Sequence, residues 1–162
     1  MDAPRIFIQS EDFDVDAEVA RMTRGKPNTG AVVTFTGVCR DERGQLATLE
    51  LEHYAGMAEG EIRRIAEEAA RRWPLSGVTV IHRYGRMTPG DRIVLVVTAS
   101  EHRQAAFEAA GFLMDFMKSR APFWKKEHRR DGSAGDWVGA RAEDEAAAER
   151  WDDNGGAAAV RR

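Results

Sequence analysis

Apolar residues recur along the chain at two spacings, which predict a succession of strands and helices. Short alternating or continuous apolar runs are typical of strands, whereas apolar residues three and four positions apart are typical of one helical face. Strands are predicted at residues 5–9, 30–39, 46–54, 77–86 and 91–98, and helices from Ser10 to about Gly25 and at residues 57–72 and 101–119. The order β-α-β-β-α-β-β-α indicates an α+β fold with mostly antiparallel strands.

The polar turn at residues 41–44 separates two of these strands. Residues 30–39 are rich in Val, Thr and Phe, which predicts a largely buried strand. Residues 46–54 alternate, with Leu49 and Leu51 on one face and Glu50 and Glu52 on the other. A hairpin between the two strands is therefore predicted.

The elements that follow have clear boundaries. Residues 57–72 carry an apolar stripe of Ile62, Ile65, Ala66 and Ala69, and Pro74 ends this helix. The strand at 91–98 is apolar on both faces, which predicts a central position in the sheet. Ser100 is placed to cap the helix at 101–119.

The length of 162 residues predicts one domain, residues 1–151, followed by a flexible Gly- and Ala-rich tail at 152–162. The sequence has no apolar run typical of a signal peptide or a membrane span, so we expect a cytoplasmic protein with no membrane partner. The single cysteine, Cys39, has no partner for an internal disulfide and fits a reducing compartment.

Charge is unevenly distributed along the chain. The net charge is -3, yet residues 118–130, KSRAPFWKKEHRR, hold six basic residues and one acidic residue. This segment, predicted to be irregular, therefore carries +5 and the remainder -8. A basic segment in an acidic protein indicates a local anion site, and the near-neutral total argues against a nucleic-acid coat protein.

Lys118 continues a helical stripe formed by Arg103, Phe107, Ala110 and Met114, so it is predicted to lie on or beside the face that meets the core. Its amine either extends to solvent or occupies a pocket suited to acid-base chemistry or phosphate binding. The rigid segment Pro122-Phe123-Trp124 separates Lys118 from Lys125. Two amines held in this way are expected to converge on one anionic ligand, with the aromatic residues also serving as core anchors.

His102 and Arg103, in the first turn of the same helix, form a second candidate anion site. A straight helix places Arg103 about 22 Å from Lys118, too far for one small ligand to contact both. The two helix ends therefore serve separate sites, or a dimer brings one subunit's His102 and Arg103 to the other's Lys118. Arg40, where a buried strand meets a turn, is a weaker candidate.

The four histidines, 53, 82, 102 and 128, lack metal-ligand spacing, and we predict neither a metal nor a cofactor. P-loop, Rossmann and Gly-x-Ser-x-Gly motifs are absent from the sequence. The strand position of Cys39 favours a small buried residue over a nucleophile.

Several segments together resemble one known family, the large, catalytic subunit of molybdopterin synthase. The most specific is KSRAPFWK, Lys118 to Lys125. The others are Gly30 to Gly37, Leu49 to Tyr54, Gly56-Met57, Arg72 to Leu75, Val80 to Arg83, Pro89 to Asp91, Ser100 to Arg103, Met114-Asp115, Trp137-Val138 and Ala140-Arg141. The similarity covers about residues 5 to 151.

The resemblance implies an α/β-hammerhead fold and a sulfurtransferase of molybdenum cofactor biosynthesis. It implies cyclic pyranopterin monophosphate (precursor Z) as substrate, converted to molybdopterin. The sulfur donor is a thiocarboxylate on the C-terminal Gly-Gly of a small ubiquitin-like subunit. Large subunits of the family form a homodimer with a small subunit at each end, a heterotetramer.

The resemblance also implies substrate-binding positions: Val38, Cys39, Arg40, His102, Arg103, Lys118, Lys125, Lys126, Glu127 and, across the dimer, Arg141. Lys118 is expected to be the main acid-base or electrostatic group, and Lys125 to orient substrate and support the intermediate attached to the partner's tail. Cys39 is given no role as a sulfur carrier, since the partner brings the sulfur.

Two other functions remain open from the residues. The basic and aromatic residues at 118–130 are compatible with a module that binds single-stranded RNA, although the acidic remainder of the chain disfavours nucleic acid. Lys118 is also compatible with a Schiff-base lyase acting on a phosphorylated carbonyl substrate.

Overall fold

The computed structural model describes residues 1–54, 56–139 and 142–153. Its elements, in chain order, are β1 Arg5–Gln9, α1 Val15–Thr23, β2 Ala31–Val38, the 3-10 turn η1 Glu42–Gly44, β3 Leu46–His53, α2 Met57–Arg72, β4 Leu75–Arg83, β5 Gly85–Met87, β6 Arg92–Ser100, α3 Arg103–Ser119, β7 Phe123–Arg129 and α4 Ala142–Asp153. β5, β7 and α4 are elements that the sequence pattern did not predict separately.

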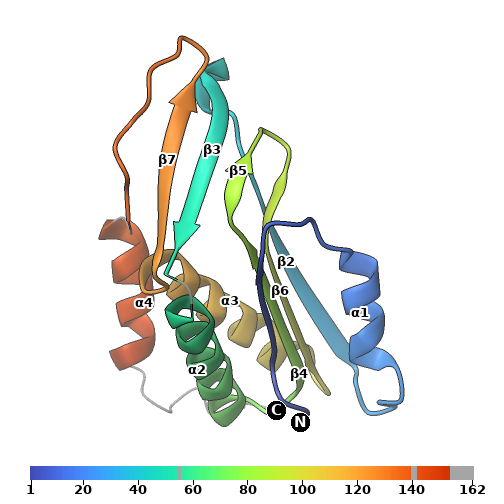
Figure 1. Cartoon of the computed structure of the whole chain (residues 1–162). Coiled ribbons are helices and arrows are strands. Elements are labelled where there is room, and N and C mark those ends of the chain that lie inside the picture. Colours follow the sequence, from blue (N-terminus) through green and yellow to red (C-terminus); the bar gives the residue numbers. More distant parts are fainter. Residues whose placement is uncertain (55, 140–141, 154–162) are drawn as a thin grey trace.

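The strands form two sheets. The main sheet has the order β1-β4-β6-β2 and the smaller one β5-β3-β7. β1 and β4 are parallel, and the other pairs are antiparallel, which confirms the predicted α+β class. The smaller sheet extends beyond one end of the main sheet, and α4 lies beside α3 (Figure 1).

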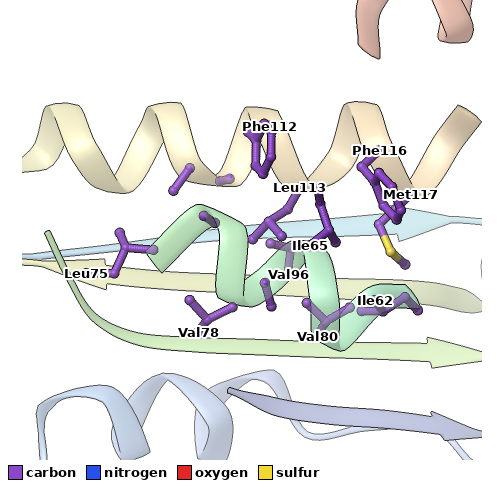
Figure 2. Packing of buried hydrophobic residues seen from close by; sticks show 14 of the residues in the cluster. Ile62, Ile65, Leu75, Val78, Val80, Val96, Phe112, Leu113, Phe116 and Met117 are labelled. Carbon is purple, nitrogen blue, oxygen red and sulfur yellow. The ribbon is translucent and has the colours of Figure 1, made fainter. Parts of the chain in front are cut away.

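The core lies on both faces of the main sheet. On one face, α2 and α3 pack on the sheet through Ile62, Ile65, Leu113, Phe116 and other apolar residues, as Figure 2 shows. On the other face, Phe13 and Met22 cover Leu95 and Val97. Since Val94 and Val96 face the first cluster and Leu95 and Val97 the second, β6 is buried on both sides, as its sequence predicted.

The helix predicted at 57–72 is confirmed as α2, whereas two predicted helix starts are wrong. α1 begins after Asp14, whose carboxylate accepts a hydrogen bond from the Ala17 N–H at 3.0 Å, and not at Ser10. Ser100 ends β6 and donates its hydroxyl to the Pro74 carbonyl at 2.8 Å, so His102 occupies the N-cap position of α3.

The predicted hairpin between residues 30–39 and 46–54 is wrong, because β2 pairs with β6 while β3 pairs with β5 and β7. After β2, Cys39 donates its N–H to the Asp91 carbonyl (2.7 Å) and accepts from the Gly90 N–H (2.8 Å). These bonds attach the chain to the turn before β6 and prevent a return along β2.

β2 is not largely buried, contrary to the sequence prediction. It is an edge strand of the main sheet, with Phe35 39% and Val38 51% exposed. Apolar composition predicted the strand correctly but not its burial, since an edge strand keeps one side unpaired.

Two further segments differ from prediction. The strand predicted at 77–86 divides near Tyr84, and Gly85, at φ +96°, begins β5 in the smaller sheet. The basic segment is not irregular: residues 123–129 form β7, which pairs with β3 from Leu46 to His53.

The C-terminal region begins with α4, where Trp151 packs against Trp73 and Phe112 with ring centroids 5.6 Å from each. Asp152 belongs to this helix, so the part of the predicted tail at 152–153 is helical. Residues 154–162, the rest of that tail, lie outside the described residues.

Candidate functional site

A cavity of about 170 Å³ lies where the two sheets meet. Its described walls come from β2, β3, β4, β6, the last turns of α3, β7 and the stretch before and at the start of α4. Apolar lining side chains include Leu49, Leu51, Ile93, Val94, Met114, Met117 and Phe123, and the charged or titratable ones are His82, Lys118, Lys125 and Asp144. A mostly apolar wall with a few polar groups is typical of a small-molecule site.

Two lysines on different elements line this cavity. Lys118 lies in the last turn of α3, where the helix dipole favours a positive charge. Lys125 lies in β7, and its backbone N–H and C=O bond to Val138 at 3.0 and 2.8 Å. Asp144 is the one acidic group among the described lining residues, so the lysines favour an anionic ligand.

Lys118 combines the two environments that the sequence left open, since its side chain is exposed and also lines the cavity. The predicted helical stripe that leads to Lys118 lies along the border of the buried face of α3, and not along the centre of that face. Phe107 is 63% exposed and Arg103 is exposed, whereas Ala110 is buried.

His82, at the end of β4, is the buried titratable residue of this wall. Its ring stacks on Phe123 with centroids 3.7 Å apart and an interplanar angle of 17°. Burial lowers the pKa of His82 to about 4, and the positive charge of Lys118 acts in the same direction. His82 is therefore neutral at pH 7.

Phe123 serves as the predicted core anchor, whereas Trp124 belongs to none of the core clusters. Phe123 packs against the main core cluster and lines the cavity, and its ring centroid lies 6.1 Å from that of His53. Trp124 also lines the cavity and meets the Tyr54 ring edge-on at 4.7 Å. The rigid aromatic segment therefore fixes the start of β7, and with it Lys125.

Of the predicted site residues Val38, Cys39 and Arg40, Val38 alone lines the cavity, next to Gly37. Cys39 is buried in a separate cluster with Leu46, Leu51 and Met87. Burial raises the pKa of the Cys39 thiol, and the charges of nearby acidic residues, Asp91 first, raise it further. This environment agrees with an unreactive cysteine and separates it from the lysines.

The structure separates three other predicted residues from the cavity. Arg40 pairs with Glu42 at 2.6 Å and lines a second hollow with Glu127. Lys126 is opposite Glu50 in the β3–β7 register and lies over the Trp137 ring at 5.7 Å. Because side chains of a strand alternate between faces, Lys125 and Lys126 point to opposite sides of the smaller sheet. This division weakens the hypothesis of one continuous RNA-binding surface.

His102 and Arg103 are exposed at the opposite end of α3 from Lys118, so one chain does not bring them to the cavity. Arg141, the predicted contribution across a dimer, lies outside the described residues.

The sequence reasoning missed His82, Met114 and Met117 as cavity residues. Their only sequence signal is position: His82 ends a buried strand, and the methionines precede Lys118 by four residues and one. Nothing in this pattern shows that β4, α3 and β7 meet.

The described residues contain neither a metal-binding cluster nor a membrane-spanning helix. In residues 1–54, 56–139 and 142–153, no group of three or more His, Cys, Asp or Glu side chains is arranged to hold a metal ion. Within the same part of the chain, no helix has the length and apolar character needed to cross a membrane.

The α+β fold and its lysine-lined cavity define a protein suited to an anionic small-molecule ligand. Comparison with known proteins makes this class specific. The model of the MoaE protein family matches residues 8–120. Curated relatives named molybdopterin synthase catalytic subunit include one from Mesorhizobium japonicum, 66% identical over 92% of this chain and 94% of its own, and one from Brucella melitensis, 61% identical over 91% of each.

Solved structures agree with the sequence comparison. A molybdopterin biosynthesis MoaE protein from Burkholderia ambifaria is 47% identical, with a TM-score of 0.79 over 92% of this chain and 98% of its own. A molybdopterin synthase from Staphylococcus aureus is 31% identical, with a TM-score of 0.74 over 86% and 98%. The chain therefore belongs to the MoaE protein family, which confirms the resemblance found in the sequence.

Proposed function

We propose that this chain is the catalytic subunit of a molybdopterin synthase, a sulfurtransferase that acts on cyclic pyranopterin monophosphate in molybdenum cofactor biosynthesis. The names of its relatives support the activity. The observation that carries the proposal is the position of Lys118 and Lys125, which line one cavity from two different elements. The substrate phosphate and a thiocarboxylate are both anionic, and both are stabilised by ammonium groups.

In this proposal Lys118 is the electrostatic or acid-base group beside the attacked carbon of the substrate. Lys125 orients the substrate and stabilises the intermediate that joins it to the sulfur donor. The backbone bonds of Lys125 to Val138 and its place between β3 and residue 138 support a fixed position for its backbone, from which the side chain reaches the cavity. The exposed Lys118 at a helix end leaves room for a second protein to approach.

The sulfur donor is proposed to be a small ubiquitin-like subunit whose C-terminal Gly-Gly thiocarboxylate enters the cavity. Two copies of the present chain form the central dimer of a heterotetramer. His102 and Arg103 then serve the cavity of the second copy, which is consistent with their distance of about 22 Å from Lys118 along α3. Arg141 is proposed to contribute in the same way, and Arg40 and Glu127 to bind substrate or partner from the second hollow that they line.

We also propose that residues 1–151 act as one domain. The packing of Trp151 on Trp73 and Phe112 supports this, because it connects α4 to the main core cluster.

The proposal is tested by assaying molybdopterin formation with a thiocarboxylated small subunit and the cyclic pterin. Lys118→Ala is expected to lower kcat/KM at least about 100-fold, since it removes a charge that acts on the reacting atoms. Lys26→Ala is the matched control: Lys26 pairs with Asp2 at 3.2 Å and does not line the cavity. Wild-type rates for Lys118→Ala, or an inactive wild-type enzyme, would contradict the proposal.

A further inference from the structure

His82 is held in one orientation on the cavity wall by two contacts. Its face stacks on Phe123 at 3.7 Å, and its Nδ1 lies 2.8 Å from the Arg83 carbonyl oxygen. Phe123 is in turn paired with His53 across β7 and β3. A side chain fixed on both its face and one edge does not rotate freely, so the remaining ring edge keeps a constant direction.

The hydrogen bond of Nδ1 decides where the ring carries its proton. A carbonyl oxygen only accepts, so Nδ1 must donate its N–H to Arg83. In a neutral imidazole the other nitrogen, Nε2, is then an acceptor. The lowered pKa of His82 agrees with this neutral form.

Nε2 is the ring nitrogen left for a ligand. Among the described residues no hydrogen bond to Nε2 is present, and the His82 side chain lines the cavity with 8% of its residue surface exposed. His82 lines the cavity, and the charged groups beside it are the ammonium groups of Lys118 and Lys125 and the carboxylate of Asp144. An imidazole nitrogen is thus the neutral acceptor on a wall whose lysines only donate.

We propose that His82 is a substrate-binding residue that determines specificity, with Nε2 accepting a hydrogen bond from a ring N–H or hydroxyl group of the pterin substrate. The inference rests on the proposed function. It assigns the anionic end of the substrate to the lysines and the donor groups of its ring system to His82. A pterin that lacks the matching donor leaves Nε2 without a partner and binds less tightly.

Packing alone does not account for this histidine. A phenylalanine at the same position stacks on Phe123 equally well and avoids the desolvation of a buried polar ring. His82→Phe therefore keeps the ring contact and removes both ring nitrogens, the Nε2 acceptor and the Nδ1 donor to Arg83. His82→Gln loses the ring but places an amide oxygen near the Nε2 position, which restores the acceptor.

The test is steady-state kinetics of molybdopterin formation with wild-type enzyme, His82→Phe, His82→Gln and the control His53→Phe. His53 contacts the same Phe123 but does not line the cavity. His82→Phe is expected to raise the KM for the pterin about tenfold while kcat and the KM for the thiocarboxylated subunit stay within about twofold. His82→Gln is expected to recover at least half of the logarithm of this increase in pterin KM. His53→Phe is expected to keep the wild-type KM.

An unchanged pterin KM in His82→Phe, alongside active wild-type enzyme, would overturn the inference and leave the proposed function standing. An equal rise in pterin KM in His82→Phe and His82→Gln would indicate a packing role and overturn the inference as well. So would a change in kcat and in both KM values together. An inactive wild-type enzyme would reject the proposed function itself. Thermal unfolding of each variant identifies a folding defect. A folding defect without a selective rise in pterin KM would also indicate that His82 has a packing role, and would overturn the inference.

Discussion

The two ends of α3 carry similar residues in different surroundings. At the C-terminal end, Lys118 lies beside His82 and Phe123 on the wall of a cavity. At the N-terminal end, Arg103 and His102 are exposed, and Phe107 is 63% exposed one turn further on. A cation, a histidine and a phenylalanine occur at both ends. At the C-terminal end the histidine and the phenylalanine come from β4 and β7, which give a ligand fixed walls beside Lys118.

The difference between the two ends of α3 is tested most strongly by mixing two inactive variants of the chain, Lys118→Ala and Arg103→Ala. If one copy's Arg103 serves the other copy's Lys118, Lys118→Ala and Arg103→Ala chains are each expected to lose activity at least about 100-fold. Co-refolded in equal amounts, they should recover about one quarter of wild-type activity, because half of the dimers are mixed and each mixed dimer holds one intact site. The readout is molybdopterin formation per dimer.

Two outcomes would break the shared-site interpretation. A mixture as inactive as its components would show that both residues act within one chain. Full activity of Arg103→Ala alone would show that the exposed helix end has no part in the reaction.

The two phenylalanines should differ in their effect on stability. Phe123→Ala removes a ring that packs on His82 and the core cluster, and we expect a loss of about 2–3 kcal/mol in the free energy of unfolding. Phe107→Ala is the control, with an expected change below about 0.5 kcal/mol, since its ring is mainly in solvent. Urea unfolding measures both. Equal losses would contradict the difference in packing between the two helix ends.

The buried histidine should make the protein sensitive to acid. The pKa of His82 is lowered to about 4 from the ordinary histidine value of 6.5, so between these values the unfolded chain binds a proton that the folded chain does not. Stability is therefore complete above pH 6.5 and falls as the pH decreases towards 4, by about 2 kcal/mol at pH 5. Urea unfolding at pH 8 and pH 5 measures the loss.

His82→Phe is the control for this pH dependence, because it removes the titrating group and keeps the ring. The difference in stability between pH 8 and pH 5 should be about 2 kcal/mol smaller in this variant. An identical loss in both proteins would contradict the assignment to His82. The carboxylates of Asp12 and Glu50, whose pKa values are lowered mainly by hydrogen bonds to Arg92 and His128 respectively, lose their contribution mainly below about pH 4 and so act outside this pH range.

The spacing of apolar residues correctly predicted two kinds of element: a helix with one apolar face and a strand that is buried on both faces. α2 has one apolar stripe and ends before Pro74, and β6 is apolar on both faces, so both were predicted correctly. β7 was missed because charged and polar side chains occupy the consecutive positions 125–129 and leave no apolar period. It is a strand because β3 provides a partner for its backbone.

The sequence by itself determined the α+β class, the helix that carries Lys118, the basic segment around Lys125 and the family resemblance. The tertiary structure decided which candidates share a cavity: it joins Val38, Lys118 and Lys125, adds His82, and separates Cys39, Arg40 and Lys126. The physical reason is that strand pairing between distant segments places side chains on one face or the other. Spacing along the chain carries no information about that choice until both partners are in place.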